Sequence, residues 1–159
     1  MRPPLMRPLA ARSLTPAERA LAREMFHGRL DAARVRLFAA PLWRRAFVPG
    51  ATLIVWPAGA ARLDFGAADT PLGEQATFVH ELTHVWQAQA GVNLLFAKLK
   101  AGDAPRAYAY DLDDGCAFAA RNIEQQAMMV EHAFLARRGA TVPYSAEAYL
   151  AALPDWRRV

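Results

Sequence analysis

The sequence predicts an α+β fold in which a small β-sheet packs against long helices. Three observations carry this prediction: the β-branched apolar runs are few and short, the helical patterns are long, and the two do not alternate as βαβ units would. The chain has 159 residues, of which 54% are hydrophobic and 21% are charged. A chain of this length and composition folds as a globular domain with a core of its own.

The first residues differ in composition from the rest of the chain. Residues 1–13 are rich in arginine and proline, so we expect a flexible basic leader followed by a single domain over residues 14–159. The leader lacks the apolar stretch of about 7–15 residues that a secretory signal requires. No run reaches the roughly 18 apolar residues that cross a membrane. We therefore expect no transmembrane segment, and a protein that is cytoplasmic or exported without a cleavable signal peptide.

The stretch LTPAERALAREMF has the features of a helix start. Thr15 can cap the helix, Pro16 suits the first helical position, and Glu18 follows the cap by three residues, as a capping box requires. We expect this helix to end at Gly28, because glycine readily adopts the left-handed backbone of a helix end.

Two strands and a long helix are predicted next. Residues 33–40 alternate apolar and charged side chains, and residues 52–57 read TLIVWP, a β-branched and apolar run. Thr70 and Pro71 then repeat the cap-and-proline start of a helix, which we expect to stop at Gly91.

The C-terminal part is predicted to be mainly helical. We expect a short helix over residues 93–100, a strand or loop over 107–114, one long helix over 116–139 and a final short helix over 145–153. Cys116 is the only cysteine, which excludes a disulfide within the chain and any cysteine cluster for zinc. We expect its thiol to be buried as a small apolar group.

The predicted helix before Gly91 carries the motif HELTH. Two of the chain's four histidines, His80 and His84, lie four residues apart and so about 40° apart around the helix axis, where both can bind one ion. Glu81 lies beside them, where a general base can take a proton from metal-activated water. Apolar residues surround the motif, so these polar groups would be costly to bury without a shared metal. The residues therefore favour a metal site over a chance match.

A catalytic zinc site needs a third protein ligand. A glycine and a histidine placed three and six residues after His84 would give the H-E-x-x-H-x-x-G-x-x-H class, but the sequence has Gln87 and Ala90 there. The leading candidate is Glu124, a carboxylate in the otherwise apolar stretch NIEQQAMMVEH. Its rivals are carboxylates of a loop-like region, where such groups more often form turns or face solvent: Asp103, Asp111, Asp113 and Asp114.

Four further residues are candidates for supporting roles. Glu131 follows Glu124 by nearly two helical turns and could hydrogen-bond a ligand histidine. His132 could stabilise an oxyanion or cap the core. Tyr108 and Tyr110 could donate a hydrogen bond to a tetrahedral intermediate, or could belong to a half-buried strand.

The two motifs together carry a resemblance. VHELTHVWQ, followed about forty residues later by NIEQQA, resembles the zincin metallopeptidases with a glutamate ligand. It looks most like small bacterial proteins of metallopeptidase type that accompany Vgr and Rhs proteins of contractile injection systems. This resemblance, over roughly residues 14–140, implies a zincin-like fold in which His80, His84 and Glu124 bind Zn²⁺ and Glu81 is the base. The stretch AFVPGATLIVWP is similar to the zincin strand whose edge can hold an extended peptide.

The predicted function is therefore zinc-dependent hydrolysis of a peptide or other amide, with a peptide or protein as substrate. The alternative is a zinc-stabilised binding module without catalysis, acting with an injection-system partner of Vgr or Rhs type. Such a module has no need of Glu81 as a base. Iron sites use the same ligand types, but the helical H-E-x-x-H spacing favours zinc.

The charge distribution bears on nucleic acids as partners. The net charge is +4, and ten of the seventeen arginines lie in the first 45 residues. These arginines lack the interleaved aromatic residues that stack on bases. We therefore expect a solvated basic face, and we do not expect nucleic-acid binding.

Overall fold

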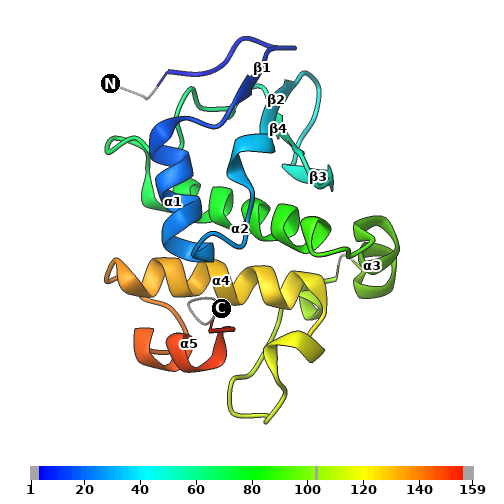
Figure 1. Ribbon diagram of the computed structural model, residues 1–159, viewed down its shortest axis with the longest axis vertical. Helices are drawn as coiled ribbons and strands as arrows, with labels where there is room; N and C mark the ends of the chain where they lie inside the picture. The colour runs from blue at the N-terminus through cyan, green and yellow to red at the C-terminus, as the bar shows by residue number, and fades with distance from the viewer. Residues whose placement is uncertain (1–3, 103, 156–159) are drawn as a thin grey trace.

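A computed structural model describes residues 4–102 and 104–155, which form a four-stranded sheet and five α-helices (Figure 1). The strands are β1 (Ala11–Ser13), β2 (Arg36–Ala40), β3 (Phe47–Gly50) and β4 (Leu53–Pro57). The helices are α1 (Pro16–Phe26), α2 (Leu72–Gln89), α3 (Leu94–Ala101), α4 (Ile123–Arg137) and α5 (Ala146–Ala152). The mixed α+β architecture is thus confirmed. Within the described ranges, no helix combines the length and the hydropathy needed to cross a membrane.

The sheet has the strand order β1-β2-β4-β3, so β3 forms one of its edges. β2 and β4 pair in parallel, with Leu37 opposite Ile54, and β1 and β3 add to them antiparallel. The run predicted as a strand at 52–57 is the inner strand β4, and its Ile54 is fully buried. β-Branched residues suit this position because their side chains pack well on a pleated surface.

α2 lies between the sheet and α4, and α5 lies beyond α4 (Figure 1). On the side of the sheet, Phe78 of α2 stacks on Phe65 with ring centroids 5.0 Å apart, and Phe65 contacts Trp56 of β4 at 4.3 Å. These aromatic contacts fix α2 against the sheet, because such rings dominate the energetics of a core. The opposite side of α2 is left to face α4.

α1 begins and ends as predicted. The Thr15 hydroxyl accepts a hydrogen bond from the backbone N–H of Glu18, whose carboxylate accepts one from the backbone N–H of Thr15. The helix ends where His27 and Gly28 adopt positive φ angles of 47° and 84°. The Glu18 carboxylate is fully buried and also accepts two hydrogen bonds from the Arg12 guanidinium, at 2.6 and 2.7 Å.

Parts of the stretch that was expected to be a flexible leader contact the domain. Ala11–Ser13 form β1, and Met6 is buried in the core. This stretch contacts the domain because the buried Glu18 carboxylate requires a cation as its partner, and Arg12 supplies it. The first three residues lie outside the described part of the chain.

The long helix expected over 116–139 begins later than predicted. α4 starts after Asn122, which caps it through a capping box with Gln125. Cys116 lies in the preceding loop, and its side chain is exposed rather than buried. Ala107 ends a short 3₁₀-helix, and residues 108–114 form turns and loop, not a strand. The sequence pattern could not separate residues 116–122 from the helix, because this stretch has three alanines, which favour a helix, and no glycine or proline.

Candidate metal centre

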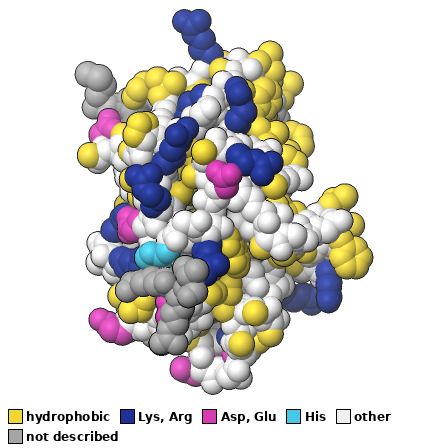
Figure 2. All heavy atoms as spheres, viewed as in Figure 1, with side chains coloured by type: hydrophobic (Ala, Val, Ile, Leu, Met, Phe, Trp, Pro, Cys, Tyr) yellow, Lys and Arg dark blue, Asp and Glu magenta, His cyan; other side chains and the backbone are white. Residues whose placement is uncertain are grey.

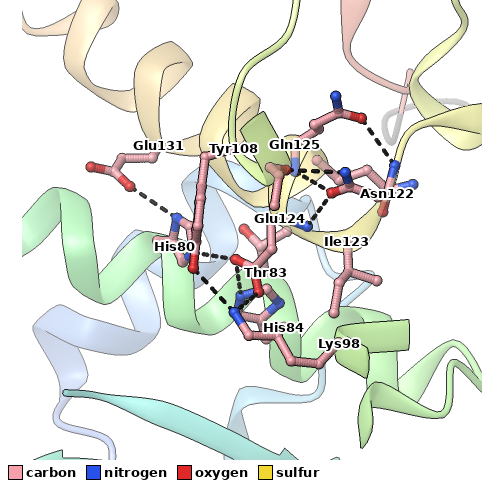
Figure 3. A network of polar contacts seen from close by, with 12 residues as sticks. His80, Thr83, His84, Lys98, Tyr108, Asn122, Ile123, Glu124, Gln125 and Glu131 are labelled. Carbon is pink, nitrogen blue, oxygen red and sulfur yellow. Dashed lines mark hydrogen bonds and ion pairs between the residues drawn. The ribbon is translucent and has the colours of Figure 1, made fainter. Parts of the chain in front are cut away.

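α2 and α4 bring together the three residues that the sequence predicts as ligands. His80, His84 and Glu124 each offer a donor atom, and these atoms lie within 4.8 Å of one another. The Nε2 atoms of both histidines are 3.4 Å from Oε2 of Glu124. All three side chains are buried, and Figure 3 shows them pointing toward one another between the two helices. They form a group that could hold a metal ion.

Glu124 owes its position to the first turn of α4. The Asn122 side chain accepts hydrogen bonds from the backbone N–H groups of Glu124 and Gln125, both at 2.9 Å. The Asn122 amide also donates to the carbonyl of Ala107 at 3.0 Å, which ties this helix end to the loop that precedes it. The capping residue thereby sets where the Glu124 carboxylate meets α2.

The outer nitrogen of His80 is held by Glu131, as the sequence predicts. Nδ1 of His80 lies 3.0 Å from Oε2 of Glu131, which comes from α4 two turns after Glu124. An ionised carboxylate can accept hydrogen bonds but cannot donate them. Nδ1 of His80 therefore carries the hydrogen, and Nε2 faces Glu124. Metal sites commonly use such a partner to orient a ligand histidine.

The outer nitrogen of His84 is held by Gln87, a role that sequence reasoning missed. Nδ1 of His84 lies 2.8 Å from Oε1 of Gln87. The amide nitrogen of Gln87 donates to the carbonyl of Ile123 at 3.0 Å and to Oε1 of Gln126 at 2.9 Å. Because that nitrogen is used, the oxygen must face His84, which makes Nδ1 the donor and leaves Nε2 for a ligand. The VWQ that follows HELTH was the available signal.

Lys98 of α3 is a second missed residue. Its ammonium group lies 2.6 Å from Oε1 of Glu124, the carboxylate oxygen that does not face the histidines. It also donates to the hydroxyl of Tyr108 at 3.1 Å, which places Tyr108 at the edge of the centre. The signal in the sequence was a lysine within the apolar stretch NLLFAKLK.

Glu81 is buried next to the two histidines. Its Oε2 atom is among the few buried side-chain atoms of the described residues that have no hydrogen-bond partner. Burial raises the pKa of this carboxyl, and the charges of His84 and His80 lower it by less. Burying a carboxylate oxygen without a hydrogen-bond partner costs folding free energy. Such an atom in a folded protein therefore calls for an explanation, such as a catalytic role.

The charges of the centre are strongly coupled. Burial alone would raise the pKa of the Glu124 carboxyl, but hydrogen bonds with His80 and His84 hold the pKa well below its usual range. Burial lowers the pKa of His80, and hydrogen bonds with Glu124 and Glu131 outweigh this effect and raise the pKa to about 9. The buried carboxylates thus make a positive charge favourable in the space between the donor atoms.

The remaining candidates lie away from the ligand group. Tyr110 and His132 hydrogen-bond each other, and Tyr110 also bonds Tyr149 of α5, so this pair joins the loop to α4 and α5. Of the rival carboxylates, Asp111 accepts a hydrogen bond from Tyr144, and Asp114 pairs with Arg121. Asp113 is exposed and does not belong to the ligand group, and Asp103 lies outside the described residues.

Comparison with known proteins places the chain among relatives. No protein-family model matches it. It is 35% identical over a 143-residue alignment to the type VI secretion system spike protein VgrG2b of Pseudomonas aeruginosa strain PAO1. The effector domain of P. aeruginosa VgrG2b has a solved structure, which matches with a TM-score of 0.70 at 30% identity over 89% of this chain and 81% of that one. The chain belongs to the family of this effector domain.

The relationship confirms the predicted link to bacterial Vgr-related proteins, and the relative is a spike protein of type VI secretion. The alignment with the whole spike protein VgrG2b covers 79% of this chain but only 13% of the spike protein. The chain therefore corresponds to the effector domain of VgrG2b and spans a small part of the whole protein.

This VgrG2b-like domain has a cleft of about 530 Å³ at the candidate centre. Its walls come from the β2–β3 loop, β3 and α3, and they include Trp43, Phe47 and Leu95. His80, Glu81, His84 and Glu124 line the same cleft. The three candidate ligands and the unpartnered Glu81 thus share one cleft with apolar side chains of the β2–β3 loop, β3 and α3.

Proposed function

We propose that this domain is a zinc-dependent hydrolase of peptide bonds that serves as the effector part of an injection system. The observation that carries the proposal is the placement of Glu81. A buried carboxylate oxygen without a hydrogen-bond partner adjoins three converging ligand residues and lines a cleft. A site that only stabilised the fold would have no use for this group.

The donor set fits zinc. Two imidazole nitrogens and one carboxylate oxygen are the ligands of many catalytic zinc sites, and the hydrogen bonds from Nδ1 leave each Nε2 free to bind. His80, His84 and Glu124 would hold the ion. When bound, zinc would polarise a scissile carbonyl and make water more acidic.

The protein's own groups would then carry the proton. Glu81 takes a proton from the attacking water and passes it to the leaving amine, which matches its position beside the ligand residues. Tyr108 lines the cleft, and its hydroxyl accepts a hydrogen bond from Lys98. This hydroxyl can donate a hydrogen bond to the oxygen of the tetrahedral intermediate. The open edge of β3 offers backbone groups on which an extended peptide can align.

The similarity to a secretion-system effector supports the setting of this activity. VgrG2b is a spike protein of type VI secretion, and the matched part of it is its effector domain. We propose that the present domain likewise acts with an injection-system protein that delivers it.

The test combines metal analysis with peptide cleavage. Wild type, Glu81→Gln, His84→Ala and the exposed control Glu147→Gln are loaded with zinc, and a proteome-derived peptide mixture is analysed by mass spectrometry after incubation. We expect one zinc per chain and new peptide ends with wild type and Glu147→Gln, zinc without cleavage in Glu81→Gln, and neither in His84→Ala. Full cleavage by Glu81→Gln would overturn the assigned base. Zinc binding without any cleavage would favour the non-catalytic binding module.

A further inference from the structure

Large exposed apolar side chains line the cleft. Trp43 and Phe47, whose ring centroids are 5.2 Å apart, come from the β2–β3 loop and β3, and Leu95 comes from α3. Trp43 is 52% exposed and Leu95 is 75% exposed. Figure 2 shows hydrophobic side chains gathered on the surface over α3. Clusters of exposed apolar residues in a concave site mark places where a ligand is bound.

The loop that carries Trp43 is held in an unfavourable backbone conformation. The preceding Leu42 has a φ angle of 60°, in the left-handed region that a bulky residue rarely adopts. Its own side chain is fully exposed, so packing of Leu42 does not account for this conformation. Such conformations cluster at ligand-binding segments, and here the turn leads directly to the ring that lines the cleft.

The cleft also contains charges that restrict what can enter. Arg45 and Lys98 line it together with the carboxylates of Glu81 and Glu124, and Lys98 pairs with Glu124. No carboxylate lies among the aromatic wall residues 43–49. A basic side chain there would lie near Arg45 without a partner, whereas an apolar side chain would cover the exposed rings.

We infer that Trp43, Phe47 and Leu95 form a specificity pocket for a large apolar side chain of the substrate, next to the peptide bond that is cleaved. The occupant is an extended peptide with leucine, methionine or an aromatic residue at this position. Calling this peptide a substrate rests on the proposed hydrolase function, but its binding to the cleft does not. The exposed wall residues become buried when the side chain is bound, which supplies the selectivity.

The helix α3 provides a matched pair of variants for the test. Leu95 and Leu99 are both leucines, both 75% exposed and four residues apart, but only Leu95 lines the cleft. Zinc-loaded wild type, Leu95→Ala, Trp43→Ala and Leu99→Ala are incubated with a randomised peptide library, and the cleaved positions are sequenced. In parallel, immobilised Glu81→Gln with and without Leu95→Ala selects intact peptides from the same library.

We expect wild type and Leu99→Ala to prefer large apolar residues over alanine at one position beside the cleaved bond by about 10- to 100-fold. Leu95→Ala and Trp43→Ala should lose most of this preference. Equal preferences in Leu95→Ala and wild type, or a preference for small or charged residues, would overturn the pocket. If nothing is cleaved but apolar peptides are retained in a Leu95-dependent way, the hydrolase proposal fails and the pocket stands. Retention that does not depend on Leu95 overturns the pocket.

Discussion

Oε1 of Gln87 accepts a hydrogen bond from Nδ1 of His84 at 2.8 Å, and both residues lie on α2. The amide nitrogen of the same glutamine reaches the carbonyl of Ile123 at the start of α4. One side chain therefore orients a candidate ligand histidine and joins α2, which carries two candidate ligands, to α4, which carries the third.

This relationship predicts that Gln87→Met lowers zinc affinity about 10- to 100-fold, because His84 loses the acceptor that orients it. Zinc affinity is measured by competition with a chromophoric chelator. The control is Gln89→Met, since Gln89 bonds Asp31 and Ala51 away from the centre. An equal loss of affinity in both variants would show a general effect on α2 instead.

Zinc should stabilise the folded domain, because the three ligand atoms converge only when α2 and α4 are packed together. At a zinc concentration 100 times the dissociation constant, we expect about 2.7 kcal/mol, or a Tm higher by roughly 5–10 °C. Addition of a chelator should reverse the shift in differential scanning fluorimetry. His84→Ala should show no shift, whereas His27→Asn, at an exposed histidine, should keep it. A shift of the same size in His84→Ala would contradict the site.

Arg12→Met should destabilise the domain by about 3–5 kcal/mol, because it leaves the fully buried Glu18 carboxylate without its cation. The double variant Arg12→Met/Glu18→Met should be more stable than Arg12→Met alone, since no unpaired charge remains. Urea unfolding measures both. At the surface pair of Arg138 and Glu24, Glu24→Met should cost less than about 1 kcal/mol. Equal costs at the two pairs would refute the role given to Arg12.

Gly66→Ala should cost about 1–3 kcal/mol of stability, because the added Cβ would lie 2.6 Å from the backbone carbonyl carbon of Ala17 in α1. Gly73 has the opposite environment, as it lies in α2 with nothing within 4 Å of the place that an added Cβ would occupy. Gly73→Ala should therefore stabilise by about 0.4–1 kcal/mol. Thermal unfolding of the two variants should move in opposite directions, and a loss in both would contradict the open space at Gly73.

The pair of Glu74 and Arg62 predicts a pH dependence. Hydrogen bonds from Arg62 lower the pKa of the Glu74 carboxyl below its ordinary 4.5, against the effect of burial. A lowered folded-state pKa stabilises the fold above pH 4.5, and this contribution is lost as the pH falls through the folded value. Glu74→Gln should remove up to about 1 kcal/mol at pH 7 and flatten the acid limb of the stability curve. Parallel curves for both proteins would contradict this coupling.

Local patterns in the sequence predicted much of the candidate centre. His80 and His84 converge because helical spacing alone places them on one side of α2. Glu124 and Glu131 could be selected because a carboxylate in an apolar helix needs a partner. The capping box of α1 likewise depends only on neighbouring residues.

The features that sequence reasoning missed depend on contacts between distant segments. β1 forms because Arg12 meets Glu18 and β2, and a composition rich in arginine and proline does not reveal this pairing. Gln87 and Lys98 acquire their roles only when α3 and α4 have been placed against α2. The late start of α4 depends on Asn122, whose amide is anchored on Ala107 across the intervening loop.

The hydrogen bond from Asn122 to Ala107 affects which members of the family can keep the candidate site. Glu124 follows the helix-capping residue Asn122 by two positions, and Asn122 is bonded to the surface loop through Ala107. The position of the Glu124 carboxylate relative to His80 and His84 therefore depends on a loop outside α2 and α4. An insertion or deletion between residues 108 and 121 can therefore displace the third donor while HELTH stays unchanged. If the domain binds zinc as proposed, relatives that keep the motif but alter this loop are expected to include proteins that bind no zinc, and comparison of loop lengths would separate them from the rest.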